Sequence, residues 1–276
     1  MSSPYIPYLA TIEDIKLEVG GERPIKTFTF KFNDKKVQDS FNYMPGQTMM
    51  VSVFGVGESM FAISCWGKEY FQVSVMKVGK NTTALHELEV GDVIGARGPY
   101  GNPFPVKEWE GKNIVFIGGG IGQAPLRPII QYMLANRKKY KKLTVIYGAR
   151  TSGDLVYKDE LFELEKADGI NVHLSIDVEE EDWTRFVGFV PTNLMEVKPS
   201  PNNSIAITCG PPIMIKFVIQ NLEKLGFESQ QIYTTLEARM KCGIGKCGRC
   251  NVGNFFICKD GPVFCWSELK EIKADL

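Results

Sequence analysis

The chain of 276 residues is 44% hydrophobic and 23% charged, which is typical of a folded globular protein with one to three compact units. Lys plus Arg and Asp plus Glu number 32 each, so no net charge attracts nucleic acid or an anionic membrane. The N-terminus lacks the basic and apolar regions of a signal peptide, and the longest apolar run, "IVFIGGGIG", is too short to cross a bilayer. We therefore expect a cytoplasmic protein with no membrane insertion and no nucleic-acid partner.

The chain contains seven cysteines. In the cytoplasm these are expected to be thiols, because that compartment opposes structural disulfides and the number is odd. Metal or redox chemistry is then the leading use for any cluster of them. Cys65 and Cys209 lie far from the others in sequence, which favours small buried apolar residues.

Residues 1–107 are predicted to form an all-β domain. Between turn signals such as Pro45-Gly46 and Gly91-Asp92 lie the alternating or β-branched runs "IKTFTFKF", "QTMMVSVF", "FQVSVMKV" and "DVIGARG". Short strands at this spacing predict an antiparallel sandwich or barrel. One short helix is expected at "TTALHEL".

Residues 108–232 are predicted to form a doubly wound, mostly parallel α/β domain. The continuous apolar run "IVFI" is typical of a strand buried on both faces. A helix is expected next, because apolar residues recur with helical spacing from Leu126 to Leu134. Strands and helices then alternate, which indicates parallel strands with right-handed crossovers. The further strands are expected at 142–149, 171–177 and 204–210, and the further helices at 159–167 and 212–226.

Residues 233–276 break into glycines, cysteines and the short strand-like pieces "FFIC" and "PVFC", so we expect a small third module there. The charge runs "NRKKYKK" (136–142) and "EEED" (179–182) are interpreted as solvated ends of elements.

Four cysteines in the third module follow the spacing Cys242-x4-Cys247-x2-Cys250-x7-Cys258. Four soft ligands specify an iron–sulfur cluster or zinc. Zinc sites usually pair cysteines on two separate knuckles, whereas a C-x4-C-x2-C opening is the order of plant-type [2Fe–2S] proteins. We predict these four residues as the ligands of a [2Fe–2S] cluster, with zinc as the alternative. Cys265 is an alternative fourth ligand, but its apolar neighbours favour a core position.

The stretch "IVFIGGGIGQAPLRPII" predicts a strand, a glycine turn and a helix. Glycines there let a turn approach a ligand, and free N–H groups at the helix start attract phosphate. The dinucleotide fingerprint G-x-G-x-x-G is not met, because Gln123 or Pro125 stands at its last position, so tight packing of strand and helix is an equal explanation. "TCGPPIM" follows another strand. Ligands bind at the carboxyl ends of parallel strands, so 118–122 and 209–212 are predicted to face one crevice.

The stretch "VMKVGKNTTALHEL" lies in the all-β domain. Gly79 relaxes the turn, and Thr82 or Thr83 is expected to cap the short helix and leave N–H groups for an anion. An ordinary helix cap is the alternative.

The motifs "FAIS" (61–64), "VGKNTT" (78–83), "GGGIGQAP" (118–125), "YGAR" (147–150) and "CGPP" (209–212) stand between a predicted barrel and the four-cysteine module. In this order they resemble the ferredoxin-NADP reductase superfamily, and within it the gamma subunits of cytosolic hydrogenases and sulfhydrogenases. The B subunit of anaerobic sulfite reductase and the electron-transfer subunit of dihydroorotate dehydrogenase belong to the same branch. The resemblance covers nearly the whole chain.

The resemblance implies an antiparallel β-barrel that binds a flavin, usually FAD, followed by an NAD(P)-binding domain and a [2Fe–2S] module. The implied flavin-binding residues are Phe61, Ala62, Ile63, Ser64, Val78, Gly79, Thr82 and Thr83. The implied nucleotide-binding residues are Gly118, Gly119, Gly120, Ile121, Gly122, Arg150, Cys209, Gly210 and Pro211. Cys209 is implied as the catalytic residue near the nicotinamide.

Two departures leave cofactor choices open. Wider-family flavoproteins carry Arg-x-Tyr-Ser where this chain has Phe61-Ala62-Ile63-Ser64, which removes a phosphate-binding cation and an aromatic stack and leaves FAD or FMN open. Arg150 is placed to meet the adenosine end of the dinucleotide, with a surface arginine as the equal alternative, so NAD or NADP stays open.

The implied activity is that of an electron-transfer subunit in a multi-subunit redox complex. Hydride passes from NAD(P)H to the flavin, and single electrons pass through the cluster to a partner such as a hydrogenase or sulfite reductase. Lys241, Lys246 and Arg249 are expected to raise the cluster potential or to mark a docking face, with a solvated surface as the alternative. Neither His86 nor His173 is expected to be catalytic, because this hydride transfer needs no general base. The alternatives are a stand-alone NAD(P)H–ferredoxin reductase and a zinc-binding scaffold protein.

Overall fold

The computed structural model describes residues 4–271, which form two compact units. Unit 1 contains the residues up to 104 together with 127–131 and 236–262. Unit 2 contains 105–126, 132–235 and the residues from 263 onward. The domain boundaries predicted from the sequence stay predictions. In the described part of the chain, no helix has both the length and the apolar character that a membrane span requires.

Unit 1 is built on a six-stranded antiparallel sheet in the order β4-β3-β6-β1-β2-β5. The edge strands β4 and β5 meet only in the isolated bridge between Ile63 and Val73, so the sheet is barrel-like without a full closing ladder. This confirms the predicted antiparallel barrel. The strands are β1 (Tyr8–Val19), β2 (Ile25–Phe32), β3 (Thr48–Val53), β4 (Gly57–Ala62), β5 (Phe71–Met76) and β6 (Val93–Tyr100), and the helices are α1 (Lys35–Ser40) and α2 (Lys80–His86).

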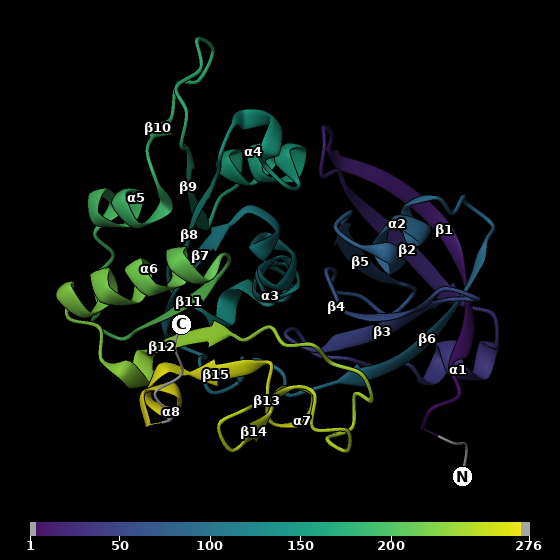
Figure 1. Cartoon of the computed structure of the whole chain (residues 1–276). Coiled ribbons are helices and arrows are strands. Elements are labelled where there is room, and N and C mark those ends of the chain that lie inside the picture. Colours follow the sequence, from purple (N-terminus) through teal and green to yellow (C-terminus); the bar gives the residue numbers. More distant parts are fainter. Residues whose placement is uncertain (1–3, 272–276) are drawn as a thin grey trace. The chain divides into compact units, whose positions relative to one another are not determined.

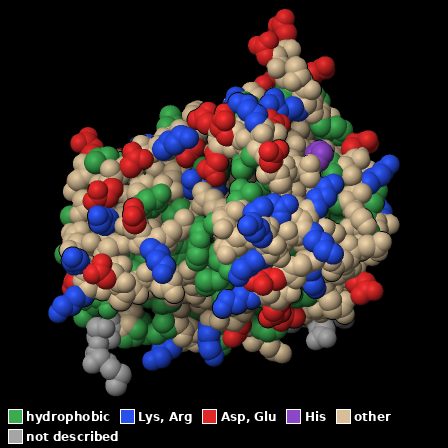
Figure 2. Space-filling view, turned by 180° about the vertical axis from the view of Figure 1, so that it is seen from behind, with side chains coloured by type: hydrophobic (Ala, Val, Ile, Leu, Met, Phe, Trp, Pro, Cys, Tyr) green, Lys and Arg blue, Asp and Glu red, His purple; other side chains and the backbone are tan. Residues whose placement is uncertain are grey.

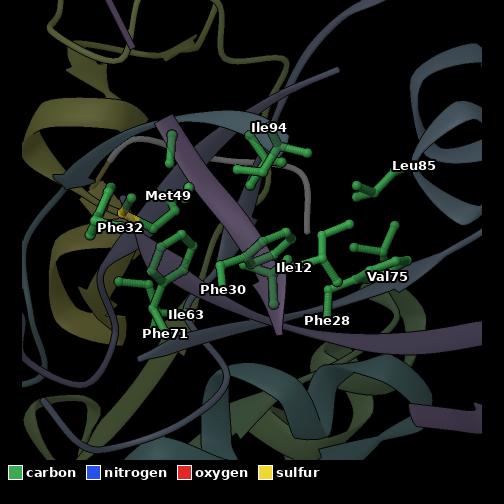
Figure 3. Packing of buried hydrophobic residues seen from close by; sticks show 14 of the residues in the cluster. Ile12, Phe28, Phe30, Phe32, Met49, Ile63, Phe71, Val75, Leu85 and Ile94 are labelled. Atoms are coloured by element: carbon green, nitrogen blue, oxygen red, sulfur yellow. The ribbon is translucent and has the colours of Figure 1, made fainter. Parts of the chain in front are cut away.

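The core of unit 1 follows from the alternation in "IKTFTFKF". Successive side chains of a strand point to opposite faces, so Phe28, Phe30 and Phe32 all enter the core. Phe30 stacks on Phe71 with a ring-centroid separation of 5.2 Å, and Figure 3 shows these rings beside Ile12 and Ile63. The packing of aromatic side chains therefore stabilises the apolar core of the barrel.

Unit 2 is built on a seven-stranded sheet in the order β10-β9-β8-β7-β11-β12-β15 (Figure 1). All neighbouring strands are parallel except β12 and β15, which confirms the predicted parallel α/β architecture. The strands are β7 (Asn113–Gly119), β8 (Leu143–Ala149), β9 (Ile170–Ile176), β10 (Phe186–Val187), β11 (Ser204–Cys209), β12 (Ile232–Thr235) and β15 (Val263–Cys265).

The helices of unit 2 include α5 (Val190–Val197) and α6 (Pro212–Lys224), which pack against each other and cover one face of the sheet (Figure 1). Leu194 of α5 and Val218 of α6 share a buried cluster with Val115 and Ile146 of the strands. The sequence pattern did not predict α5. The remaining helices are α3 (Gln123–Ala135, with 127–131 counted in unit 1), α4 (Lys158–Lys166), α8 (Trp266–Glu271) and the 3-10 turns η1 (Gly120–Gly122), η2 (Arg137–Lys139), η3 (Ser152–Asp154) and η4 (Ser229–Gln231).

Residues 236–262, here called the cysteine segment, belong to unit 1. They contain the two-stranded sheet of β13 (Asn251–Val252) and β14 (Phe255–Phe256) and the short helix α7 (Ile257–Asp260). The strand predicted at "PVFC" is present as β15, but it pairs with β12 in the sheet of unit 2.

The two charge runs lie at the surface as predicted. Residues 136–142 cover η2 and the turn before β8, and residues 179–182 lie in the loop between β9 and β10. Figure 2 shows acidic side chains gathered on this loop, while basic and acidic side chains are interspersed over the rest of the visible face. This mixture is what a net charge of zero predicts.

Replacing a core ring of unit 1 tests its packing. Phe30 is 0% exposed, so Phe30→Ala is expected to lower the free energy of unfolding by about 3–5 kcal/mol through lost burial and a residual cavity. Leu17→Ala is the control, because this leucine of β1 is 58% exposed and its loss should cost less than about 0.5 kcal/mol. Urea denaturation followed by tryptophan fluorescence measures both, and equal losses would contradict the packing described.

Candidate functional site

The glycine turn joins β7 to α3 at the carboxyl edge of the parallel sheet. Cys209 at the end of β11 lies in register with Gly118 of β7, so the two stretches predicted to meet at one edge are neighbours. A Cβ atom on Gly122 would lie 2.3 Å from the Cys209 carbonyl oxygen. The turn therefore packs backbone to backbone against the start of "CGPP".

Packing accounts for three of the four predicted glycines. A Cβ on Gly118 would meet Gln123 at 2.9 Å, and one on Gly119 would meet the Met214 sulfur at 2.4 Å. A Cβ on Gly122 is excluded in the same way by the Cys209 carbonyl oxygen. Gly120 differs, because an added Cβ would have no neighbour within 4 Å and its φ is +52°. Gly120 is thus the position of the turn that faces open space.

The turn also carries an unsatisfied acceptor. Gln123 begins α3, is 2% exposed, and its Oε1 has no hydrogen-bond partner within residues 4–271. The first N–H groups of a helix have no acceptor in the helix itself. Tyr147 supports the turn by donating its hydroxyl to Gly120 O at 3.0 Å. Donors at the helix start, an open Gly120 and a buried acceptor fit a dinucleotide with phosphate oxygens and amide donors.

Arg150 and Cys209 occupy different environments. Arg150 directly follows β8 and is exposed, and its Nε lies 3.2 Å from Asp154 Oδ2. Cys209 is buried at the end of β11, where Thr235 Oγ1 donates to its Sγ at 3.3 Å. Both stand at carboxyl ends of parallel strands, as expected, and their roles stay predictions.

The two stretches predicted to hold a flavin lie in unit 1, and Asn81 joins the second stretch to β4. With its amide oxygen toward β4, Asn81 accepts from Ser59 Oγ at 2.9 Å and from Ser59 N at 3.1 Å, and it donates to Gly57 O. The start of α2 is thereby held against the first half of β4, the strand that ends with Phe61 and Ala62.

The start of α2 differs from the predicted cap. The helix begins at Lys80 with Gly79 as its N-cap residue, so Thr82 and Thr83 lie inside the first turn. Thr82 Oγ1 accepts from the N–H groups of Val78 and Gly79 at 3.0 and 2.9 Å. The hydroxyl thus holds the turn that precedes the helix, and an added Cβ on Gly79 would meet nothing within 4 Å.

The residues of "FAIS" divide between the core and the edge of the barrel. Ile63 packs in the core beside Phe71 (Figure 3), while Phe61 and Ala62 are half-buried. Ser64 is buried, and its Oγ lies 3.2 Å from Ser74 Oγ. Phe61, Ala62 and the exposed Val78 therefore present an apolar surface to a ligand, whereas the Ile63 side chain packs in the core. These half-buried residues and the open backbone at Gly79 fit a flat aromatic ring carrying a phosphate.

The cysteine segment curls its backbone around sulfur atoms. The N–H groups of Ile244, Lys246 and Cys247 point at Cys242 Sγ over 3.5, 3.3 and 3.4 Å. Gly245 N donates to Cys258 Sγ at 3.2 Å. The curl needs left-handed backbone conformations, and the glycines at 243, 245 and 248 have φ of +77°, +70° and +71°.

The N–H donors and burial together set the pKa values of the thiols. Burial by itself would raise the pKa of Cys242, but the N–H groups of Ile244, Cys247 and Lys246 lower that pKa to about 6. Burial and the adjacent Cys250 thiol raise the pKa of Cys258 to about 12. Cys242 also contacts Cys247, so the four cysteines form two adjacent pairs.

Four thiols around N–H donors fit a soft metal centre that binds thiolates. Within residues 4–271, no group of three His, Cys, Asp or Glu side chains is arranged to hold a single metal ion. Cys265 lies in unit 2, where its thiol contacts Ser229 O at 3.4 Å and Ser267 Oγ at 3.1 Å. These are the contacts of a structural residue.

The sequence did not predict the contacts that Arg97, Glu58 and Tyr100 make near the cysteine segment. Arg97 is buried in β6, forms an ion pair with Glu58 of β4, and donates to the carbonyl oxygen of Cys242 at 3.3 Å. The available signal was a charged residue inside the otherwise apolar first half of "VIGARGPY".

Comparison with known proteins identifies two regions of the chain. Residues 116–220 match the family described as "Oxidoreductase NAD-binding domain", and residues 237–270 match the "Iron-sulfur cluster binding domain of dihydroorotate dehydrogenase B". A solved chain of an NADH-dependent reduced ferredoxin-NADP oxidoreductase superposes with a TM-score of 0.73 and 24% identity, covering 100% of this chain and 95% of that one. The matched domains define an oxidoreductase with an NAD-binding domain and an iron–sulfur domain, and the superposition shows that its fold is similar to that of the solved chain.

Relatives that are similar in sequence define the family of this oxidoreductase more closely. The sulfhydrogenase 1 subunit gamma of Pyrococcus furiosus is 40% identical over 88% of this chain and 86% of its own length. A probable dihydroorotate dehydrogenase B (NAD(+)) electron transfer subunit of Methanocaldococcus jannaschii is 36% identical over 93% of this chain and 90% of its own length. The chain belongs to the family that contains these gamma and electron transfer subunits.

Two glycines of the cysteine segment provide a matched test. Gly243 and Gly248 have nearly equal positive φ, so an alanine at either position incurs about the same backbone strain of roughly 1–2 kcal/mol. Only Gly243 is crowded, because its added Cβ would lie 2.9 Å from the Tyr100 ring. Gly243→Ala is expected to lose most bound iron and Gly248→Ala to keep most of it. Iron per chain after anaerobic reconstitution measures this, and equal iron contents would show that the Tyr100 contact is unimportant.

Proposed function

We propose that the chain is an electron-transfer subunit that carries electrons between NAD(P)H and a partner redox enzyme by way of FAD and a [2Fe–2S] cluster. The observation that carries this proposal is the cysteine segment, whose N–H donors surround Cys242, in the same chain as an NAD-binding domain. When bound, a flavin exchanges electrons in pairs with a nicotinamide and singly with an iron–sulfur cluster.

The carboxyl edge of the parallel sheet is proposed to bind the dinucleotide. Gly120 leaves room for the pyrophosphate at the start of η1, the turn that leads into α3. Cys209, Gly210 and Pro211 are proposed to flank the nicotinamide. Arg150 is proposed to reach the adenosine end after leaving its exposed contact with Asp154. No side chain needs to move a proton for hydride transfer.

The edge of the barrel is proposed to bind FAD. Phe61, Ala62 and Val78 supply apolar surface for the ring, and the backbone around Gly79 approaches the phosphates. Ile63 and Ser64 contribute through their backbone and through the core beneath the ring. Thr82 contributes by holding the turn before α2, and Thr83 by the first turn itself.

The four cysteines at 242, 247, 250 and 258 are proposed to hold the cluster. The N–H groups aimed at the sulfurs stabilise the negative charge that reduction adds, which raises the potential. Lys241, Lys246 and Arg249 are exposed beside these cysteines. We assign this basic surface to the partner, because complementary charges steer association.

The partner is proposed to be another subunit of a cytoplasmic redox complex, since the relatives are named as gamma and electron transfer subunits. Such a subunit delivers electrons to an active site on a different chain, for example that of a hydrogenase.

Spectroscopy of the anaerobically purified chain tests this function. Addition of NADH or NADPH should bleach the flavin absorbance and produce the electron paramagnetic resonance signal of a reduced [2Fe–2S] cluster. A comparison of the two additions also decides whether the chain prefers NADH or NADPH. A colourless protein that contains zinc and neither flavin nor iron would refute the proposal.

Gly120 and Gly21 form a matched pair for the nucleotide site. Both have positive φ and open space around an added Cβ, so alanine causes similar backbone strain at each. Gly120→Ala is expected to weaken NADH binding about tenfold or more by occupying the space meant for the pyrophosphate, and Gly21→Ala to leave it unchanged. Fluorescence titration with NADH measures both affinities, and an unchanged affinity for Gly120→Ala would place the dinucleotide elsewhere.

A further inference from the structure

An ion pair with a buried arginine lies beside the cysteine segment in unit 1. Arg97 is 4% exposed, and its Nη2 lies 2.9 and 3.0 Å from the two carboxylate oxygens of Glu58, which is 33% exposed. Within the described residues, Arg97 Nε is buried without a hydrogen-bond partner. A buried guanidinium with an unsatisfied donor contributes little to stability compared with apolar packing. Its position therefore calls for an explanation other than stability.

The second nitrogen of Arg97 connects separate parts of unit 1. Nη1 lies within donating distance of Pro4 O (3.0 Å), Tyr100 OH (3.2 Å) and Cys242 O (3.3 Å). Because a guanidinium is planar, its contacts on one side fix the direction of its donors on the other. The contact with Glu58 thus orients the donor that reaches the Cys242 carbonyl.

Tyr100 fixes the same peptide from another direction. A Cβ on Gly243 would lie 2.9 to 3.1 Å from three atoms of the Tyr100 ring, so the ring rests directly on this residue. At the far end of the cysteine segment, Asn102 N donates to Gly261 O at 2.6 Å. Residues 97–102 therefore hold both ends of the loop that carries the four cysteines.

The pair also carries charge close to the first cysteine. Reduction adds one negative charge to a metal centre at Cys242, and a buried cation nearby favours that state while a carboxylate opposes it. Exposed Lys241 and Lys246 are screened by water and salt, whereas Arg97 is screened much less.

We propose that Arg97 is a positioning residue for the cluster: through Cys242 O it fixes the peptide of the first ligand and favours the reduced state, while Glu58 orients Arg97 and has the opposite electrostatic effect. This inference rests on the proposed function, since it requires a cluster at Cys242.

The test uses the full chain with its cluster and compares Arg97→Gln, Glu58→Gln, the double variant and Arg97→Lys. The midpoint potential is measured by electron paramagnetic resonance during titration with dithionite, which adds one electron per cluster and breaks no bond in the protein. Iron and flavin contents are determined for each sample.

The two single variants are expected to shift the potential in opposite directions. Arg97→Gln should make the cluster harder to reduce and Glu58→Gln should make it easier, each by about tenfold in the reduction equilibrium, which equals 59 mV for one electron. The double variant should return toward the wild-type potential. Arg97→Lys should have a midpoint potential close to that of the wild type, because a lysine keeps the charge. It should change the line shape of the electron paramagnetic resonance signal, because a lysine lacks the planar donors.

Arg185 and Glu165 of unit 2 provide the control, because they form an ion pair with a more exposed arginine, and no described contact links that pair to a cysteine. Arg185→Gln and Glu165→Gln should leave the potential unchanged. Shifts of the same sign in Arg97→Gln and Glu58→Gln, or no shift in either with full iron content, would overturn the proposal.

If Arg97→Gln cannot retain its cluster, Glu58→Gln and Arg97→Lys decide the matter. A raised potential in Glu58→Gln supports the proposal, and an unchanged one refutes it. A wild-type chain without iron would remove the proposed function itself, whereas a wild-type chain with a reducible cluster and unresponsive variants would remove only this inference.

Discussion

The N–H groups that converge on Cys242 Sγ are the constraint on which the cysteine segment depends. Several donors can face one sulfur only if the backbone turns back on itself, and this demands glycines with positive φ. Such a loop has little apolar surface of its own, so it needs an external support. The end of β6 and the turn after it supply that support through Arg97, Tyr100 and Asn102, and the barrel is thereby tied to the cysteine segment.

The sequence predicted the elements whose signals are local. The alternation in β2, the apolar run of β7 and the cysteine spacing each lie within a few residues, and the structure contains the corresponding strands and loop. β1 was missed because two register shifts, after Ile12 and after Leu17, interrupt its alternation. α5 was missed because it is short and begins at Val190 after a loop, with Pro191 in its first turn. Arg97 was missed because its partners at 58 and 242 are distant in sequence, and no periodic pattern records such a contact.

The glycines of the turn are present for two different structural reasons, which the sequence alone cannot distinguish. Three glycines are required because strand ends and helices approach one another closely, whereas Gly120 is spared such contacts. The same division occurs in "FAIS", where Ile63 completes the core and Phe61 stays at the edge. A motif in this fold therefore mixes residues that build the scaffold with residues available to a ligand, and only the packing tells them apart.

The pairing of β12 with β15 bears on how the cysteine segment is inserted in the chain. Thr235 and Val263 are cross-strand partners, so the chain leaves the nucleotide-binding sheet and returns to it at adjacent points. The entropy of closing so long an excursion changes only slowly with its length. Insertions or deletions inside it that keep the contacts with residues 97–102 would thus leave the parallel sheet intact, so the cysteine segment can vary in length while the architecture of unit 2 stays the same.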